Sequence, residues 1–323
     1  MITVICGGVG AARFLRALRL VTGPGEVIGV VNTGDDTTLH GLAISPDLDT
    51  ITYTLAGAID PGRGWGLVDE TWNAMSALER YASVRPTGSD AAPTWFNLGD
   101  HDLATHFYRT ARLAEGATLT DVTAEICAAW DVPERLIPMT DDRVATMVDL
   151  LDGRTVTFQE YFVQLRHGVP IRAARFVGAE QATLQPSAVA AIAGADIVVI
   201  APSNPIVSIG PLRALAGFDA LLAARRDTVV AVSPIVGGAA LKGPADRMLV
   251  ELGMDASVTS VARLYTKIAS ALVIDPVDAH LADDVATAGM RPIVTPSIMS
   301  SPDISATLAR ATLAAGARPA ALS

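Results

Sequence analysis

Short apolar runs alternate along this chain with segments whose apolar residues recur every three or four positions. The runs are rich in Val and Ile, and each stops at polar or turn-forming residues: ITVIC, EVIGVVN, DIVVIAPSN, TVVAVSP and SALVID. Continuous apolar runs of this kind are typical of strands buried on both faces of a parallel sheet. Segments between them, such as AARFLRALRLV, PLRALAGFDALLAAR and ADRMLVELG, have the spacing of amphipathic helices. The alternation predicts an α/β fold with a mostly parallel sheet flanked by helices.

Residues 60–140 interrupt this alternation. Three helical segments follow one another there, DETWNAMSALERY, DHDLATHFYRTARLAEG and LTDVTAEICAAW, with no clear strand between them. We interpret 60–140 as a helical insertion within a single domain that spans 1–323, because no Pro- or Gly-rich linker divides the chain. Beyond it, ATMVDLLDGRTVTFQEYFVQL predicts a β-hairpin about an Asp-Gly turn.

Composition narrows the class of protein. The 323 residues are 50% hydrophobic, enough for one large core, and the net charge of −10 argues against a nucleic-acid partner. Only two cysteines occur, Cys6 and Cys127, which excludes a disulfide framework. The start MITVICGGVG has no basic leader, and no uncharged apolar run is long enough to span a bilayer. We therefore expect a reduced cytoplasmic protein with no membrane partner.

A glycine-rich turn joins the first predicted strand to the first predicted helix. It reads GGVGAAR, with Gly7, Gly8 and Gly10 followed by Arg13 in the first helical turn. Backbone N–H groups in such a turn can face a phosphate at the helix N-terminus, and Arg13 can add a charged contact. The third glycine of the dinucleotide fingerprint is missing, and the turn is no Walker A loop. The alternative is that the glycines serve only close packing of the helix on the strand.

Four aspartates follow the second predicted strand: Asp35, Asp36, Asp47 and Asp49. In a dinucleotide-binding fold one acid at this place holds a ribose, and Asp35 can do so, which leaves the other three without a role. A hard cation such as Mg2+ prefers carboxylate and water oxygens, so Asp35 and Asp47 can instead hold one between them. Capping of turns and helices is the alternative for all four, but clustering beyond a strand end is atypical of capping alone.

Two later strand ends carry the same kind of polar chemistry. Ser203 and Asn204 lie between prolines that fix a turn, which suits them to bind a ligand through hydrogen bonds. Further along, SPIVGGAALKGPADRM contains Lys242 among glycines and indicates a second anion-binding loop. Ordinary Pro- and Gly-containing turns are the alternative for both. His40, His101 and His106 lack metal-ligand spacing, and we expect His106 to pack on an apolar helical face.

Six segments together resemble the CofD/FbiA family of 2-phospho-L-lactate transferases, over nearly the whole chain. They are GGVGAARFL, NTGDDTTLHGLAISPDLDT, GAIDPGRGWG, ETWNA, WFNLGDHDLATH and APSNPIVSIGP. The resemblance implies a Rossmann-like, Mg2+-dependent, homodimeric enzyme of coenzyme F-420 biosynthesis. Such enzymes transfer a phospholactyl group, or in the FbiA branch a phosphoenolpyruvyl group, from a guanosine diphosphate-linked donor to the deazaflavin alcohol FO and release GMP. Ala11 departs from the family, which often continues with glycine.

The resemblance also assigns roles to residues. It implies that Asp35 and Asp47 bind Mg2+, and that the glycine turn and Ser203–Asn204 line the site. On this basis Asp36 or Asp49 orients the cation or accepts the proton of the FO hydroxyl. Lys242 steadies the diphosphate, and Trp65 or Trp72 stacks on a flat ring, although buried aromatic residues more often belong to the core.

Two other functions stay open from the residues alone. One is a non-catalytic, CofD-like regulator that binds a nucleotide or sugar nucleotide through the same glycine turn. The other is an NAD-dependent dehydrogenase, in which Asp35 binds ribose, but which needs no cluster of acids. The sequence does not choose among lactate, enolpyruvate and glycerate derivatives as the donor acid.

Overall fold

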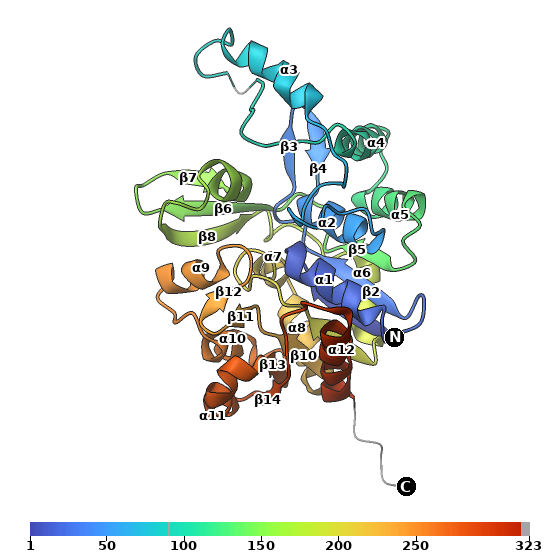
Figure 1. The fold of residues 1–323 in the computed structure, drawn as a ribbon, viewed down its shortest axis with the longest axis vertical. Coiled ribbons are helices and arrows are strands. Elements are labelled where there is room, and N and C mark those ends of the chain that lie inside the picture. Colours follow the sequence, from blue (N-terminus) through green and yellow to red (C-terminus); the bar gives the residue numbers. More distant parts are fainter. Residues whose placement is uncertain (90, 318–323) are drawn as a thin grey trace.

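Seven strands form one parallel sheet at the centre of the computed structural model, which describes residues 1–89 and 91–317 (Figure 1). From one edge to the other they are β14 (Arg291–Val294), β13 (Ala271–Ile274), β10 (Val229–Val232), β9 (Ile197–Ile200), β1 (Ile2–Cys6), β2 (Val27–Val31) and β5 (Arg135–Pro138). Every neighbouring pair is parallel. The α/β fold predicted from the apolar runs is confirmed.

Helices cover both faces of this sheet, which explains why its strands are apolar without interruption. Their bounds are α1 (Gly8–Leu18), α2 (Pro46–Leu55), α3 (Asn73–Ala82), α4 (Asp102–Ala114), α5 (Leu119–Ala129), α6 (Pro186–Gly194), α7 (Gly210–Ala214), α8 (Phe218–Ala223), α9 (Ala245–Glu251), α10 (Val258–Tyr265), α11 (Ala282–Thr287) and α12 (Pro302–Gly316). In β1, Val4 and Cys6 belong to the core that contains α1 and α12. Ile5, which points the other way, belongs to the core that contains α6, α8 and α10. Among the residues described, no helix is long and apolar enough to cross a membrane.

The predicted helix over 211–225 is two helices. A break at Gly217, whose φ of 85° lies in the left-handed region, separates α7 from α8. Glycine reaches this conformation without the steric cost that other residues pay, so the chain turns there. Two short 3-10 helices, η2 (Arg226–Thr228) and η3 (Pro276–Leu281), complete this half of the molecule.

Residues 60–140 contain the three predicted helices, α3, α4 and α5. They also contain β5, which pairs with β2 at the edge of the central sheet and which the pattern did not indicate. Only four residues form this strand, and the last is a proline, so its sequence carries no strand signal of its own. That 60–140 is an insertion within one domain stays a prediction.

A β-hairpin links the central sheet to α3 and α4. Its strands are β3 (Thr37–Leu39) and β4 (Leu42–Ile44), joined by His40 and Gly41, whose φ angles are 55° and 78°. Two residues with positive φ form the turn type that matches the twist of paired strands. Leu39 and Ile44 pack with residues of α3 in a small apolar cluster, and Figure 1 shows the hairpin extending toward that helix.

The predicted hairpin after residue 145 is confirmed in its first part. Strands β6 (Ala145–Leu150) and β7 (Thr155–Thr157) pair antiparallel, and β8 (Ile171–Val177) adds a third strand. The following residues form a π-helix, η1 (Glu160–Gln164), instead of more strand. Thr157 and Glu160 explain the change: each side chain accepts a hydrogen bond from the other's backbone N–H, at 2.7 and 3.2 Å. This reciprocal capping ends the strand and starts a helical turn. A separate short pair, β11 (Ile235–Val236) and β12 (Ala239–Ala240), follows β10.

Gly10 should prove essential for stability, because a Cβ there would overlap the backbone carbonyl oxygen of Pro202. We expect Gly10→Ala to lower the free energy of unfolding by about 1–3 kcal/mol, the usual cost of overpacking. Gly194→Ala is the matched control, since a Cβ at this helical glycine meets nothing within 4 Å. Denaturant unfolding of both variants measures the difference. Equal stabilities would show that α1 and the loop after β9 separate without cost.

Candidate active site

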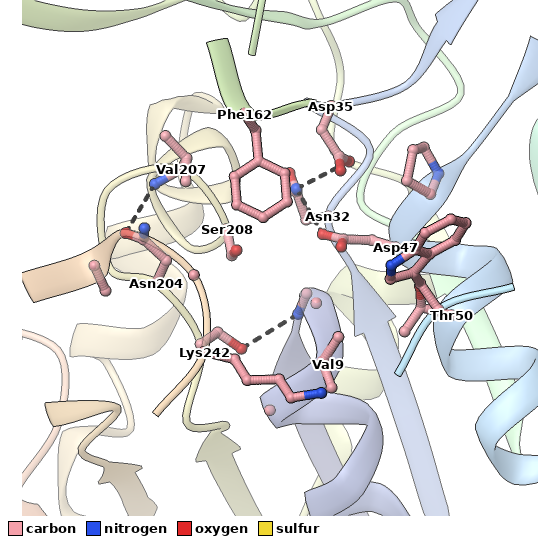
Figure 2. Close-up of a pocket in the computed structure, with 18 of the residues that line it drawn as sticks. Val9, Asn32, Asp35, Asp47, Thr50, Phe162, Asn204, Val207, Ser208 and Lys242 are labelled. Atoms are coloured by element: carbon pink, nitrogen blue, oxygen red, sulfur yellow. Dashed lines mark hydrogen bonds between the residues drawn. The ribbon is translucent and has the colours of Figure 1, made fainter. Parts of the chain in front are cut away.

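A cavity of about 610 Å³ opens at the carboxyl ends of the central strands. Segments that follow β1, β2, β9 and β10 line it, and β1 lies where the order of the sheet changes direction. In open α/β sheets ligands bind at this switch point, beyond the carboxyl ends of the strands. The cavity is therefore the first candidate for an active site, and Figure 2 shows its interior.

Asn32 joins the two aspartates that the sequence predicted as metal ligands. Asp35 follows β2, and Asp47 lies in the first turn of α2. The Asn32 side-chain amide donates to Oδ2 of Asp47 at 2.9 Å and to Oδ1 of Asp35 at 3.4 Å (Figure 2). Its own Oδ1 accepts the N–H of Gly34 at 2.9 Å. One fixed amide thus brings two carboxylates to the same wall of the cavity.

Both carboxylates are costly to ionise where they lie. Burial raises the pKa of Asp35 well above its ordinary value, and the nearby charges of Asp47 and Asp36 raise it further. Burial raises the pKa of Asp47 to about 6, although hydrogen bonds from Asn32 and from the Gly8 N–H oppose the shift. No arginine or lysine in the described ranges 1–89 and 91–317 forms an ion pair with either group. Two adjacent carboxylates with no cation of the chain beside them fit a hard divalent ion.

The other two aspartates are engaged elsewhere. Asp36 accepts a hydrogen bond from the Ser45 hydroxyl at 2.7 Å and is not among the residues that line the cavity. Asp49 lines the cavity, but both of its oxygens bind the guanidinium of the buried Arg109, one of them at 3.2 Å. The geometry thus separates Asp35 and Asp47 from the two acids beside them in sequence.

His106 belongs to a buried polar network, which corrects the expectation of simple packing. Its Nδ1 lies 3.8 Å from Asp49, and its Nε2 lies 3.4 Å from Asp102. Tyr53 donates its hydroxyl to Asp102 at 2.6 Å. Although burial opposes its ionisation, the adjacent imidazole of His106 and the hydrogen bond from Tyr53 hold the pKa of Asp102 below its ordinary value. The signal in the sequence was the spacing in α4, which puts Asp102, His106 and Arg109 on one helical face.

Asp49, Asp102 and His106 also offer three ligand atoms within 4.8 Å of one another. The guanidinium of Arg109 already donates hydrogen bonds to both carboxylate oxygens of Asp49, and its Nη1 lies 3.3 Å from Nδ1 of His106. A divalent ion there must be held next to a buried positive charge, which costs free energy. The pair of Asp35 and Asp47 suits a cation better.

The glycine turn lines the cavity together with Arg13. A Cβ on Gly7 would lie 2.5 Å from Oδ2 of Asp47, so only glycine lets this carboxylate approach the start of α1. The Gly7 N–H donates to the Ser203 hydroxyl at 3.4 Å. Gly10, in contrast, is required by packing against Pro202, so the packing alternative holds for this one glycine.

Loops that follow β9 and β10 line the cavity opposite the acidic residues. Ser203 and Asn204 line it, but Oδ1 of Asn204 accepts the N–H groups of Ile206 and Val207, so it fixes its own turn. Exposed Lys242 also lines the cavity and reaches the backbone carbonyl of Arg63 at 3.4 Å. Gly237 and Gly238 from the same loop do not line it.

Aromatic residues occupy two parts of the site. The guanidinium of Arg63 lies 5.5 Å from the ring centroid of Trp65 and 5.4 Å from that of Trp72, and of the two rings only Trp65 lines the cavity. Phe158 and Phe162, which the sequence analysis did not single out, also line it, together with Gln159 between them. Their sequence signal was weak, because the segment read as the second arm of a hairpin.

Comparisons with known proteins match almost the whole chain. The profile of the family described as 2-phospho-L-lactate transferase CofD matches residues 2–303. The chain is 42% identical to a phosphoenolpyruvate transferase from Streptomyces griseus and 44% identical to one from Streptomyces avermitilis, each alignment covering 97% of both chains. A phosphoenolpyruvate transferase from Mycobacterium tuberculosis is 40% identical, over 96% of this chain and 97% of that protein.

A solved structure has the same fold. It is a member of the UPF0052 family from Bacillus halodurans, with a TM-score of 0.62 and 13% identity, and the match covers 97% of this chain and 98% of that one. The likeness supports the Rossmann-like architecture, while the family profile and the relatives confirm the resemblance inferred from the sequence motifs. This chain belongs to the 2-phospho-L-lactate transferase CofD family.

Proposed function

We propose that this protein transfers a phosphoenolpyruvyl group, or the related 2-phospholactyl group, from a guanosine diphosphate-linked donor to FO. The reaction releases GMP and forms the dehydro or saturated form of coenzyme F-420-0. The observation that carries the proposal is the buried pair Asp35 and Asp47, joined by Asn32 at the switch point of the sheet. The name phosphoenolpyruvate transferase, shared by relatives that align over almost the whole chain, favours enolpyruvate as the donor acid.

Asp35 and Asp47 are the residues proposed to hold Mg2+. When bound, the ion supplies positive charge that offsets the charge developing on the diphosphate and on the departing GMP. Arg13 and Lys242 line the cavity and are proposed to contact phosphate oxygens. Gly7 and Gly8 carry no side chains, which leaves room for a phosphate group at the start of α1.

The proton acceptor for the FO hydroxyl was predicted to be Asp36 or Asp49. Asp36 lies outside the cavity lining, and Arg109 occupies both oxygens of Asp49, which disfavours proton transfer to either acid. We propose instead that Asp49 has a positioning role, because its ion pair with Arg109 fixes the turn of α2 that carries Asp47.

Product analysis tests the proposed function. The protein is incubated with FO, Mg2+ and either the guanylated enolpyruvyl donor or the guanylated lactyl donor, and GMP and a phosphodiester of FO are measured. Formation of both products with the enolpyruvyl donor supports the proposal. Binding of the donor without turnover would restore the regulator alternative. A homodimeric state and a cytoplasmic location stay predictions.

Asp47→Asn should remove most of the activity. An amide keeps the shape of the side chain but is a poorer ligand for a hard cation, so we expect kcat/KM to fall by about a hundredfold or more. Asp36→Asn is the matched control, because this acid belongs to the same cluster, is only half-buried and does not line the cavity. Steady-state assays over a range of Mg2+ concentrations measure both variants. Equal losses would mean that the cluster acts as a whole and not through the pair.

Asp47→Asn should also stabilise the metal-free protein at alkaline pH. Burial raises the pKa of Asp47 to about 6, so the folded state holds its proton more tightly than the unfolded chain does. Stability from this group is therefore full below about pH 4 and is lost as the pH rises through 6. In chelator at pH 8, Asp47→Asn should raise the free energy of unfolding by about 2 kcal/mol, and the gain should vanish at pH 4.

Asp149→Asn provides the control for that pH series. Hydrogen bonds from Arg175 and Thr155 lower the pKa of Asp149, so removing its charge should destabilise the protein near neutral pH. Unfolding by denaturant at several pH values measures both trends. A gain for Asp47→Asn that is independent of pH would assign it to packing and not to charge.

A further inference from the structure

Two stacked phenylalanines form one wall of the cavity. The rings of Phe158 and Phe162 lie with centroids 5.6 Å apart and planes 14° apart, and we call these two residues the aromatic wall. Phe162 is 37% exposed, and its ring points into the cavity (Figure 2). The ring of His167 stacks on Phe162 as well, with centroids 5.7 Å apart and planes 18° apart. A flat surface of this kind suits the face or the edge of a planar ring system.

Gln159, which stands between these two phenylalanines in the sequence, also lines the cavity. Its side chain is buried, and its Nε2 donates to Oδ2 of Asp35 at 3.3 Å and to the backbone carbonyl of Asp35 at 3.3 Å. The two residues are 124 positions apart in the chain. Because Asn32 donates to the other oxygen of Asp35, each carboxylate oxygen receives an amide hydrogen bond.

The backbone around Gln159 is fixed on both sides. Thr157 and Glu160 cap each other, and the π-helix η1 begins directly after Gln159. Tyr161, in the first turn of that helix, is fully buried in the core beneath the small sheet. The backbone that carries the side chain of Gln159 is therefore held by the same turn that carries the aromatic wall. Single π-helical turns of this kind occur often at functional sites.

We propose that Gln159 is a positioning residue that fixes the carboxylate of Asp35 and links it to the aromatic wall, so that cation binding and flat-ring binding depend on each other. The inference rests on the proposed function, since it takes Asp35 as a cation ligand. A partner that orients a ligating carboxylate is commonly as important as the ligand itself. Linkage between two binding sites is reciprocal. If a ring bound against Phe162 raises the affinity for the cation, the cation must raise the affinity for the ring by the same factor.

The geometry gives this linkage a physical route. A ring packed on Phe162 restricts the side chain of Phe162, and the turn that carries Phe162 also holds the amide of Gln159 against Oδ2 of Asp35. A carboxylate that is already oriented loses less freedom when it binds a cation. Neither the aromatic wall nor Asp35 needs to move far, because the two are joined through one side chain.

Calorimetry tests the proposal without reference to turnover. Mg2+ is titrated into the full-length protein with and without saturating FO, for wild type, Gln159→Met and Gln164→Met. Methionine matches the size of glutamine but donates no hydrogen bond. Gln164 is the matched control, because it lies exposed in the same π-helix.

Gln159→Met should weaken Mg2+ about tenfold, as losses of such supporting bonds commonly do. FO should tighten Mg2+ about fivefold in wild type and in Gln164→Met, and leave Gln159→Met unchanged. Wild-type affinity and an unchanged FO effect in Gln159→Met would overturn the linkage while leaving the metal site intact. Failure of wild type to bind Mg2+, or binding that Asp35→Asn does not alter, would overturn the proposed function as well.

A measurement on wild type keeps the test independent of any folding defect. The side-chain amide resonance of Gln159 is assigned by its absence from the spectrum of Gln159→Met. Both Mg2+ and FO, added separately, should shift this resonance. A resonance that responds to neither ligand would contradict the proposal, whatever the stability of the variants.

Discussion

Two carboxylates buried side by side repel each other, and the residues around Asp35 and Asp47 offset this repulsion with N–H groups instead of cations. Asn32 donates to both, Gln159 donates to Asp35, and Gly8 donates to Asp47. These dipoles orient the carboxylates without cancelling their charge, so the pair keeps its attraction for a divalent ion. The ends of β1 and β2 supply the rigidity, since both lie in the interior of the sheet.

Much of the fold was predictable because its parallel strands are buried on both faces. That burial requires uninterrupted apolar runs, and β1, β2, β9, β10 and β13 are all visible in the sequence for this reason. The exceptions were edge or peripheral strands. β5 contains four residues and ends in proline, and β3 and β4 contain three residues each, so long-range pairing and not local pattern determines them.

The candidate site was predictable only in part. Its location followed from strand ends, because polar residues gather where parallel strands stop. The partners of each acid did not follow, since Asp35, Asp36, Asp47 and Asp49 are the same residue type within fifteen positions. Contacts with residues far away in the chain separate them: Gln159 binds Asp35, and Arg109 binds Asp49. Gly10 was likewise ambiguous, because its constraint comes from the carbonyl of Pro202 on a distant loop.

The hairpin of β3 and β4 lies between the two proposed metal ligands in the chain, so Asp35 and Asp47 lie just beyond the two open ends of its strands. The two strands pair antiparallel, from Thr37 with Ile44 to Leu39 with Leu42. This pairing holds the open ends of the strands together whatever residues form the turn. Extra residues at His40 and Gly41 would lengthen the turn and leave the distance between the open strand ends unchanged. Deleting one residue within either strand would shift the pairing and draw the carboxylates apart. Across diverging sequences, length variation is therefore expected at the tip and strict length conservation below it.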